Sequence, residues 1–345
     1  MKTIDLRSDT VTLPNQGMLE AMQTAELGDD VIDIDPTVQK LQDRVAENLG
    51  KEAAIFMPSG TMTNQIGIRI HCQPGDEILC EDGCHIYNYE QAGFAQLSGL
   101  VARPIQGKNF QLSLSDLQGK IRADNEHMAR TRLLCLENTH NRGGGSILAL
   151  EAIKEMTEWA KTNGLATHLD GARLYNAVVA TGIAADQWAG PFDTVSVCFS
   201  KGLGAPIGSA LAGSQEAIAL ARRYRKLFGG AMRQAGVIAS AALFGLENNV
   251  DRLEADHQNA KILADSIAQV EGLVLDPEHV ETNIVIFRVD LANITAADFV
   301  EALESKGVRM LAFSPQHVRA VTHLGVSTEE IGAAARIIAN VAALM

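Results

Sequence analysis

The sequence of 345 residues lacks any uncharged apolar run close to the ~18 residues that a membrane-spanning helix needs. Its N-terminal residues 1–9 carry charges where a secretory signal peptide has an apolar core. An excess of positive charge is also absent, because 29 Lys and Arg stand against 42 Asp and Glu, a formal net charge of −13. That balance argues against the basic surface that nucleic acids and anionic membranes select, so we expect neither as a partner.

Cysteine is scarce as well, and its count is odd: Cys72, Cys80, Cys84, Cys135 and Cys198. This usage does not suit a disulfide framework and indicates a reducing, cytoplasmic location. Cys80, Cys84 and His85 stand close enough to raise the question of a metal. No second Cys/His pair follows at zinc-ligand spacing, so we interpret the cysteines as small buried thiols and predict no metal site.

The composition that is present describes an ordinary globular protein. Apolar residues make up 46 %, charged residues 21 %, and there are only 30 Gly and 9 Pro. These fractions exclude a disordered, collagenous or coiled-coil chain. The length is enough for a large core and predicts about two domains.

From about residue 50 to 215, short apolar runs alternate with helical periodicity, which is typical of a largely parallel sheet covered by helices. The predicted strands are residues 53–57, 77–80, 133–137, 166–169, 194–199 and 208–212. Between two of them, Ile153, Met156 and Ala160 recur at helical spacing, and Gly164 ends that helix.

The character of the chain changes after about residue 248. Residues 251–270 read as a helix and residues 283–289 as a strand, and a capping box at residues 327–330 opens a last helix over 331–345. We therefore expect an α/β fold with a large domain, residues 1–248, and a smaller C-terminal α+β domain, residues 249–345.

Three strand ends carry candidate binding groups. Gly60 and Thr61 follow a predicted strand and open a helix, where backbone N–H groups can face a phosphate, although many ordinary strand-to-helix turns have the same composition. Asp170 ends another strand and is either a ligand-binding carboxylate or a helix N-cap. A basic cluster at Arg222, Arg223, Arg225 and Lys226 is either a solvated face or one wall of an anion pocket.

Lys201 stands at the exit of a strongly apolar strand. In such surroundings an amine loses hydration and its neutral form becomes a usable nucleophile, although an isolated strand-end Lys usually reaches solvent. The combination is more informative than any one member. A phosphate turn, then a strand-end Asp, then a strand-end Lys is the order needed to hold pyridoxal phosphate by its phosphate, ring nitrogen and aldehyde.

With these segments assembled, the chain resembles the low-specificity threonine aldolases, fold-type-I pyridoxal-phosphate enzymes. The matching segments in the large domain are IDLRSDTVT (4–12), PSGTMTN (58–64), LENTHN (136–141), HLDGAR (168–173), SKGLGAP (200–206) and GGAMRQ (229–234). The C-terminal domain matches more loosely, chiefly through VRAVTH (318–323).

The resemblance implies roles around the cofactor. Lys201 would bind the aldehyde covalently, Asp170 would hold the ring nitrogen protonated, and His85 would stack on the ring. The phosphate would be bound by Gly60 and Thr61 together with Arg233 of a neighbouring subunit. The resemblance accordingly implies a homo-oligomer, with a homotetramer as the expected form.

The resemblance also implies how a small amino-acid substrate is held. Ser8, Arg173 and Arg319 would clamp its carboxylate, with Arg173 also near the cofactor, and the planar fork of Arg suits such a group. His127 would lie near the substrate hydroxyl. The implied reaction is retro-aldol cleavage of a β-hydroxy-α-amino acid to glycine and an aldehyde, with His85, His127 or a water as the base; another lyase or aminotransferase activity on a small amino acid is the alternative.

Two stretches depart from the family pattern. Residues 32–36 read IDIDP where the family usually has Tyr-Gly-Glu-Asp-Pro. Residues 143–145 are a run of three glycines, which we interpret as a flexible turn.

Overall fold

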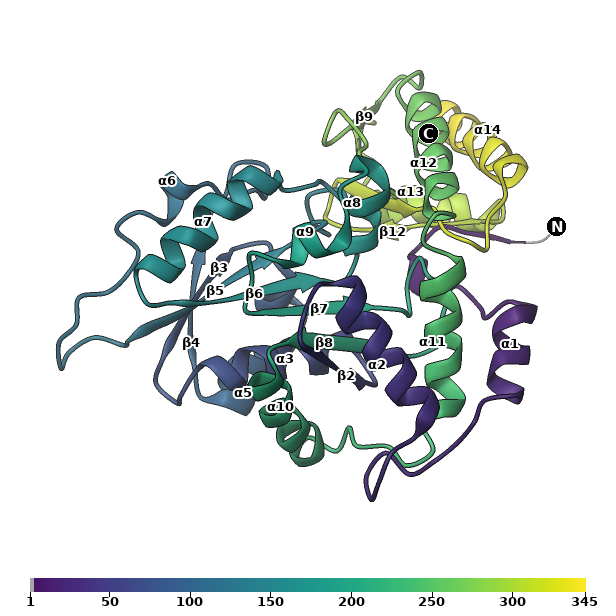
Figure 1. The fold of residues 1–345 in the computed structure, drawn as a ribbon. Coiled ribbons are helices and arrows are strands. Elements are labelled where there is room, and N and C mark those ends of the chain that lie inside the picture. Colours follow the sequence, from purple (N-terminus) through teal and green to yellow (C-terminus); the bar gives the residue numbers. More distant parts are fainter. Residues whose placement is uncertain (1–2) are drawn as a thin grey trace.

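A seven-stranded sheet forms the centre of the structure, a computed structural model that describes residues 3–345 (Figure 1). Met1 and Lys2, part of the charged N-terminus noted above, lie outside the described residues. The strands are β2 (Ala53–Met57), β3 (Glu77–Glu81), β4 (Val101–Ile105), β5 (Thr131–Glu137), β6 (Ala166–Gly171), β7 (Thr194–Cys198) and β8 (Ser209–Gly213). All six predicted strands are confirmed within a few residues; the strand that was not predicted, β4, is a half-exposed edge strand.

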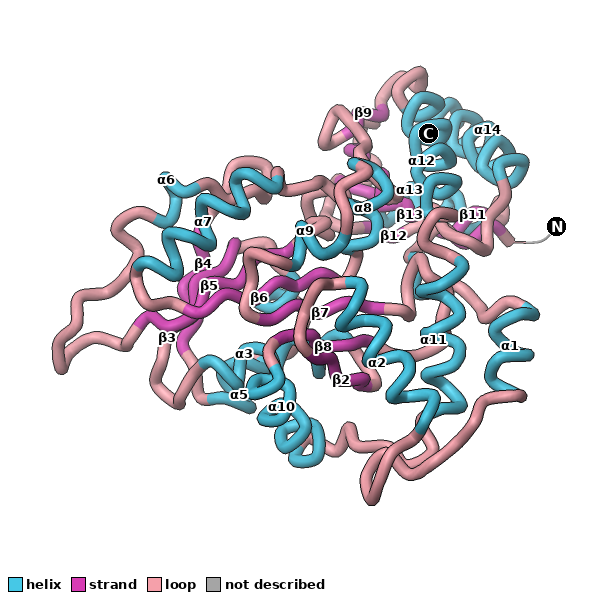
Figure 2. The backbone as a smooth tube through the Cα atoms, in the orientation of Figure 1, coloured by secondary structure: helices cyan, strands magenta, loops and turns pink. Residues whose placement is uncertain are grey.

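The strands lie in the order β2-β8-β7-β6-β5-β3-β4 (Figure 2). Strand β8 runs antiparallel to both neighbours, and the remaining pairs are parallel, so every strand but β8 points the same way. The predicted, largely parallel sheet is therefore confirmed. Because parallel strands end at one edge, the segments that follow β2, β3, β5, β6 and β7 all meet there.

Helices cover both faces of this sheet, which explains why its strands read as continuous apolar runs. Ala54 and Phe56 pack into the core on one face, whereas Ile55 and Met57 pack on the other, as the two-residue period of a strand requires. In Figure 1, α7 lies above the sheet and α3, α5 and α10 lie below it. The helices of this part are α1 (Gln16–Gln23), α2 (Pro36–Asn48), α3 (Gly60–His71), α4 (His85–Asn88), α5 (Gly93–Ser98), α6 (Leu114–Leu117), α7 (Leu150–Thr162), α8 (Leu174–Thr181), α9 (Ala185–Ala189), α10 (Gln215–Leu227) and α11 (Gly236–Asn248), with a 3-10 turn η1 (Asp9–Val11).

The C-terminal part has its own core. Its antiparallel sheet has the order β12-β13-β10-β9, built from β9 (Leu273–Leu275), β10 (Ile284–Val289), β12 (Leu311–Ala312) and β13 (His317–Val321). Three helices pack on it: α12 (Leu253–Ile267), α13 (Ala296–Ser305) and α14 (Thr328–Leu344). The predicted capping box is confirmed, with Ser327 and Glu330 bonding each other's backbone N–H at the start of α14.

The first strand does not stay with the large sheet. Strand β1 (Ile4–Asp5) pairs with β11 (Val308–Arg309), and Leu6 accepts a hydrogen bond from the Val321 amide through its carbonyl. Ile4 and Leu6 are buried in the C-terminal core because that core offers the nearer apolar surface. Residues 4–6 thus pack with the C-terminal part, and the domain bounds of 1–248 and 249–345 stay a prediction.

The glycine run is a tight contact between the two parts of the chain rather than a flexible turn. Gly144 and Gly145 both have φ near +72°, at 72° and 73°. A Cβ on Gly144 would lie 2.8 Å from Pro277 Cδ, and one on Gly145 would lie 2.3 Å from Thr282 Oγ1. Thr282 also donates a hydrogen bond to the Gly145 carbonyl. Glycine is required here by backbone conformation and by space.

The basic cluster on α10 divides in two. Arg225 is 2 % exposed and donates to Asp30 Oδ2 at 2.7 Å and to the Phe56 carbonyl at 2.8 Å, so it ties the N-terminal segment to the sheet. Arg223 and Lys226 face solvent. The cluster is thus part structural ion pair and part solvated face, and burial of Arg225 is possible because Asp30 neutralises it.

The cysteines match their interpretation as small buried thiols. All five cysteines are buried free thiols. Among residues 3–345, no helix is long and apolar enough to cross a membrane.

Candidate active site

Two adjoining cavities open at the carboxyl edge of the large sheet, and both are lined by His85 and Lys201. The Asp170 cavity, of about 240 Å³, is bounded by the start of α3, the end of β6 and the segment after β7. The Arg319 cavity, of about 390 Å³, is bounded by the N-terminal segment and by residues of the C-terminal part. Because β6 and β7 are neighbours, Asp170 and Lys201 border one space, as predicted.

The first turn of α3 forms one wall of the Asp170 cavity. Ser59 caps the helix by accepting a hydrogen bond from the Met62 amide, so the amides of Gly60 and Thr61 keep no partner within the described chain. These amides and the dipole of a 12-residue helix favour an anion at this point. Gly60 is also needed for space, since a Cβ there would lie 2.7 Å from Cys198 Sγ.

Asp170 is 1 % exposed and is not a helix cap, since it lies within β6. Its Oδ1 accepts from the Ala172 amide at 3.1 Å and its Oδ2 accepts from Asn64 Nδ2 at 2.8 Å. These neutral donors leave its buried charge without a cationic partner in the described chain. The Lys201 carbonyl accepts hydrogen bonds from Thr12 and Gly204, but its side-chain amine makes no hydrogen bond or ion pair with any described residue. The Asp170 carboxylate therefore suits a cationic ring nitrogen of a ligand, and the Lys201 amine suits an electrophilic carbon.

His85 begins α4 and borders both cavities. Its backbone amide donates to Glu137 Oε2 at 2.6 Å, and its Nδ1 lies 2.9 Å from Oε1 of the buried Glu90. Burial by itself would lower the pKa of His85, but the Glu90 hydrogen bond and the charges of Asp170, Glu90 and Glu137 outweigh it and raise that pKa.

Ligand atoms of His85, Glu90 and Asp170 all lie within 4.8 Å of one another, a spacing that also suits a cation. The oxygens of Glu90, however, already accept hydrogen bonds from His85, Asn64 and Gln65. The cluster is satisfied by these donors without a metal.

Two guanidinium groups face the Arg319 cavity. Arg173 donates to both oxygens of Asp9, at 2.7 and 2.8 Å, and both members of this ion pair are buried. Arg173 and Arg319 also donate to the same acceptor, Asn141 Oδ1, at 3.2 and 3.1 Å. Burial, and then the charge of Arg173, lower the pKa of Arg319 to about 10.

The charges around this cavity do not cancel. Asp9 compensates one of the two guanidinium groups, and Arg319 Nε has no hydrogen-bond partner among the described residues. Ser8, whose hydroxyl caps η1, lines the same space as the two arginines, as predicted. The arrangement suits a small carboxylate.

The structure does not bring His127 to these cavities within one chain. It lies in the polar segment between α6 and β5, which extends away from the body in Figure 1. The His127 side chain is 82 % exposed, and its recorded contacts are with Asn125 and Glu126. His127 therefore does not border these cavities within one chain, and its role near the substrate hydroxyl stays a prediction.

Arg233 is also outside the cavities of its own chain. Its side chain is 53 % exposed and pairs with Asp29 at 3.1 Å. Its delivery to a neighbouring subunit's phosphate site stays a prediction.

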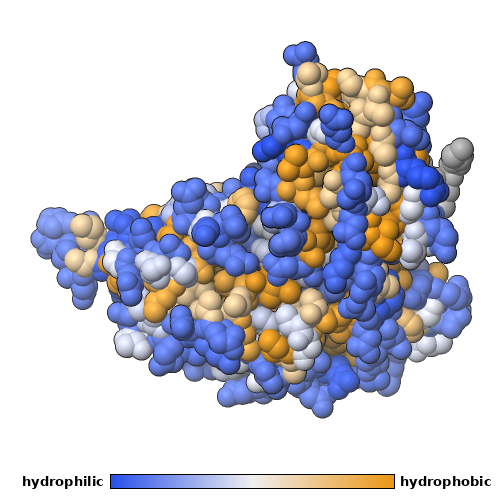
Figure 3. All heavy atoms as spheres, turned by 90° about the horizontal axis from the view of Figure 1, so that it is seen from above, coloured by the Kyte–Doolittle hydropathy of each residue, from blue (hydrophilic) through white to orange (hydrophobic). Residues whose placement is uncertain are grey.

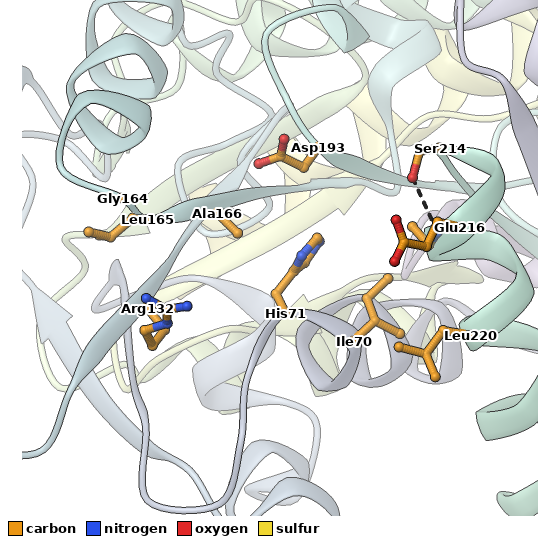
Figure 4. Close-up of a pocket in the computed structure, with 11 residues that line it drawn as sticks. Ile70, His71, Arg132, Gly164, Leu165, Ala166, Asp193, Ser214, Glu216 and Leu220 are labelled. Carbon is orange, nitrogen blue, oxygen red and sulfur yellow. Dashed lines mark hydrogen bonds between the residues drawn. The ribbon is translucent and has the colours of Figure 1, made fainter.

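Another cavity lies at the opposite edge of the sheet (Figure 4). It encloses about 540 Å³ near the amino ends of β5, β6 and β7, and His71 points toward its middle. Its lining brings together none of the residues selected from the sequence, so it is not the candidate site.

Four site residues had no assigned role in the sequence analysis: Asp9, Asn64, Glu90 and Asn141. Three of them lie inside the matched segments, which was the available signal. Glu90 lies outside all of those segments, and only the fold shows that it supports His85.

Comparison with known proteins identifies the family of this chain. The family model described as β-eliminating lyase matches residues 5–290. The low specificity L-threonine aldolase of Escherichia coli K12 is 44 % identical over 329 residues, covering 95 % of this chain and 96 % of that protein. The low-specificity L-threonine aldolase 1 of Arabidopsis thaliana is 40 % identical over 336 residues, covering 96 % and 94 %.

A solved structure of the threonine aldolase of Leishmania major superimposes with a TM-score of 0.84 at 19 % identity, covering 98 % of this chain and 99 % of that one. At that identity the likeness shows the fold, which confirms the predicted fold-type-I architecture. The chain therefore belongs to the β-eliminating lyase family, and it shares about two residues in five with low-specificity threonine aldolases over nearly its whole length.

Proposed function

We propose that this protein is a pyridoxal-phosphate-dependent carbon–carbon lyase that cleaves threonine and related β-hydroxy-α-amino acids to glycine and an aldehyde. The observation that carries the proposal is the Asp170 cavity, which places an unpartnered lysine, a buried carboxylate and a helix start around one space. The identity of 40–44 % to proteins named low-specificity threonine aldolases supports the substrate class.

The residues present fit this cofactor. Gly60 and Thr61 would bind its phosphate, Asp170 its ring nitrogen and Lys201 its aldehyde carbon. When bound, the cofactor supplies a cationic ring that accepts the electron pair left on Cα as the Cα–Cβ bond breaks. Asp170 supports that role because a buried carboxylate favours the protonated ring nitrogen.

The chain's own groups would bind and orient the substrate in the Arg319 cavity. Arg173 and Arg319 would bind the carboxylate, and their positions relative to each other are set by Asn141. This leaves the β-hydroxyl near the residues that border both cavities. His85 borders both and is the candidate in this chain to take the hydroxyl proton; a water held by it is the alternative.

We further propose that the working form is a homotetramer in the cytoplasm. His127 and Arg233 reach solvent in their own chain, so they can contribute to a site only where a second copy brings them to it. The N-terminal segment also exposes large apolar residues that a second copy would cover, namely Leu13, Ile32 and Ile34. Figure 3 shows that apolar surface is gathered in patches on the face it displays. The five free thiols support a reducing compartment.

The test is Lys201→Ala in the full-length protein. Loss of both turnover and the visible absorbance of lysine-bound cofactor is the expected result. Quantifying products over threonine, allo-threonine and phenylserine separates the proposal from its rival, because another lyase or aminotransferase would yield ammonia or a keto acid instead of glycine plus aldehyde. Acetaldehyde release from threonine by Lys201→Ala would falsify the assignment.

A further inference from the structure

Behind the candidate base lies a buried hydrogen-bond network that the proposed reaction does not yet use. Glu90 has a fully buried side chain, and Asn64 is 2 % exposed. Asn64 Nδ2 donates to Glu90 Oε1 at 2.8 Å and to Asp170 Oδ2 at 2.8 Å. One amide group therefore joins the carboxylate beside His85 to the carboxylate that would bind the cofactor ring.

The orientation of Asn64 is determined by its surroundings. Since its NH2 group serves two carboxylates, its Oδ1 must accept, and His168 Nε2 lies 3.2 Å away as the donor. Burial lowers the pKa of His168 to about 3, so this imidazole is neutral and has a single N–H. Its Nδ1 then accepts from Thr194 Oγ1 at 2.9 Å, and Thr194 in turn accepts from His71, which Figure 4 shows at the far cavity.

The same network surrounds the carboxyl group of Glu90 with hydrogen-bond donors. Its two oxygens accept from Asn64, from Gln65 and from His85 Nδ1, and none of these contacts needs a proton on Glu90. These donors suit a carboxylate at Glu90, and His85 is the basic side chain that this carboxylate contacts. His85 Nε2 keeps no partner among the described residues and is the ring nitrogen free for the cavities.

We propose that Glu90 is the positioning residue for His85 in the proposed aldolase reaction. It holds Nδ1 as a hydrogen-bond donor, so that Nε2 is the nitrogen presented to the substrate hydroxyl, and it stabilises the imidazolium that forms when Nε2 takes a proton. Asn64 keeps Glu90 in place and links it to Asp170. This inference rests on the proposed function for its chemistry and on the hydrogen-bond geometry for its residues.

The charged and titratable groups that face His85 come from several elements. Glu90 follows α4, Glu137 ends β5, Asp170 lies near the end of β6, and the Tyr89 ring is tilted against the imidazole with 5.6 Å between ring centroids. Glu137 and Asp170 remain when Glu90 is changed. Changing Glu90 therefore removes one of several negative charges near His85. It also removes the carboxylate that contacts His85 Nδ1.

Glu90→Gln tests the charge with little change of shape. Gln65 Oε1 has no hydrogen-bond partner among the described residues, so rotation of the Gln65 amide lets it accept from the new NH2 group. The variant should fold, which circular dichroism and thermal unfolding check. Asp276→Asn is the matched control, because Asp276 pairs with His317 at 3.0 Å and lines neither cavity of the candidate site, and this variant should keep wild-type kinetics.

The expected result has one readout that does not depend on turnover. Histidine NMR of Glu90→Gln, with and without cofactor, should show the pKa of His85 lowered relative to wild type, because the carboxylate that favours the imidazolium is gone. The acid limb of kcat/KM should move to lower pH in the same direction. The plateau kcat should fall by roughly tenfold to a hundredfold, the loss seen when carboxylates that orient functional histidines are changed.

A double variant separates positioning from general support. In a His85→Asn background, Glu90→Gln should cause no further loss of kcat. In the wild-type background, Glu90→Asp keeps the negative charge, so the pKa of His85 should fall less than it does in Glu90→Gln. An unchanged His85 titration in Glu90→Gln, or an equal loss of kcat with and without His85, would overturn the proposal. Failure of the Lys201→Ala test would refute the proposed reaction while leaving this NMR result intact, so the two failures are distinguishable.

Discussion

Asp9→Asn removes one charge from the buried ion pair behind the substrate cavity. Asp9 has no exposed surface and Arg173 is 7 % exposed, and they are joined by two hydrogen bonds of 2.7 and 2.8 Å. Breaking such a pair from one side leaves an uncompensated buried cation, which costs about 3–5 kcal/mol of unfolding free energy. The total unfolding free energy of an ordinary domain is about 5–15 kcal/mol, so this loss would be a large fraction of it.

Urea unfolding followed by circular dichroism measures this loss. The matched control is Asp5→Asn, four residues earlier, because Asp5 pairs with Arg7 in a half-exposed position where such a pair contributes about 0–1 kcal/mol. Arg173 would also lose the partner that orients it, so KM should rise more than kcat falls. Equal unfolding free energies for the two variants would refute the claim that the buried Asp9–Arg173 pair differs from a surface pair.

The contribution of the Asp9–Arg173 pair to the unfolding free energy should also depend on pH. Burial by itself would raise the pKa of Asp9, but the charge and hydrogen bonds of Arg173 outweigh it and hold that pKa well below its usual range. A lowered folded-state pKa contributes stability that is complete above the unfolded value of about 3.9 and is lost as pH falls toward the folded value. Wild type should therefore lose its advantage over Asp9→Asn in acid, and an advantage that grows with acid would contradict the reasoning.

Two further outcomes follow from burial and packing. Gly145→Ala should destabilise the protein more than Gly164→Ala, because both positions have φ near +72° but only the first would bring a Cβ within 2.3 Å of Thr282 Oγ1; equal thermal shifts would show that the contact relaxes freely. A thiol reagent should label none of the five cysteines in the folded protein and all five in urea, since each is buried; rapid labelling without urea would contradict the packing.

The strands and the cofactor residues were predictable because their causes are local. Buried strands read as apolar runs whatever their neighbours are, and six runs were enough to identify six strands of the large sheet. Asp170 and Lys201 could be placed together because parallel strands end at one edge. Ser327 could be identified as a cap from the four residues that form its box.

Other residues depend on partners far along the chain, and no local pattern reports those. Arg225 belongs to a basic stretch, yet it is buried because Asp30, 195 residues earlier, folds against it. The glycines at 144 and 145 suggest flexibility until Pro277 and Thr282 are seen against them.

The sequence by itself determined the layered fold, the strand ends and the residue types proposed to bind a pyridoxal phosphate, since these depend on hydrophobic period and on short motifs. Only the tertiary structure decided which polar groups meet: Asp9 with Arg173, Glu90 with His85, and Ile4 with the C-terminal core. The physical reason is range. Periodicity and capping act over a few residues, whereas the value of a charge or a donor depends on what surrounds it after the chain has packed.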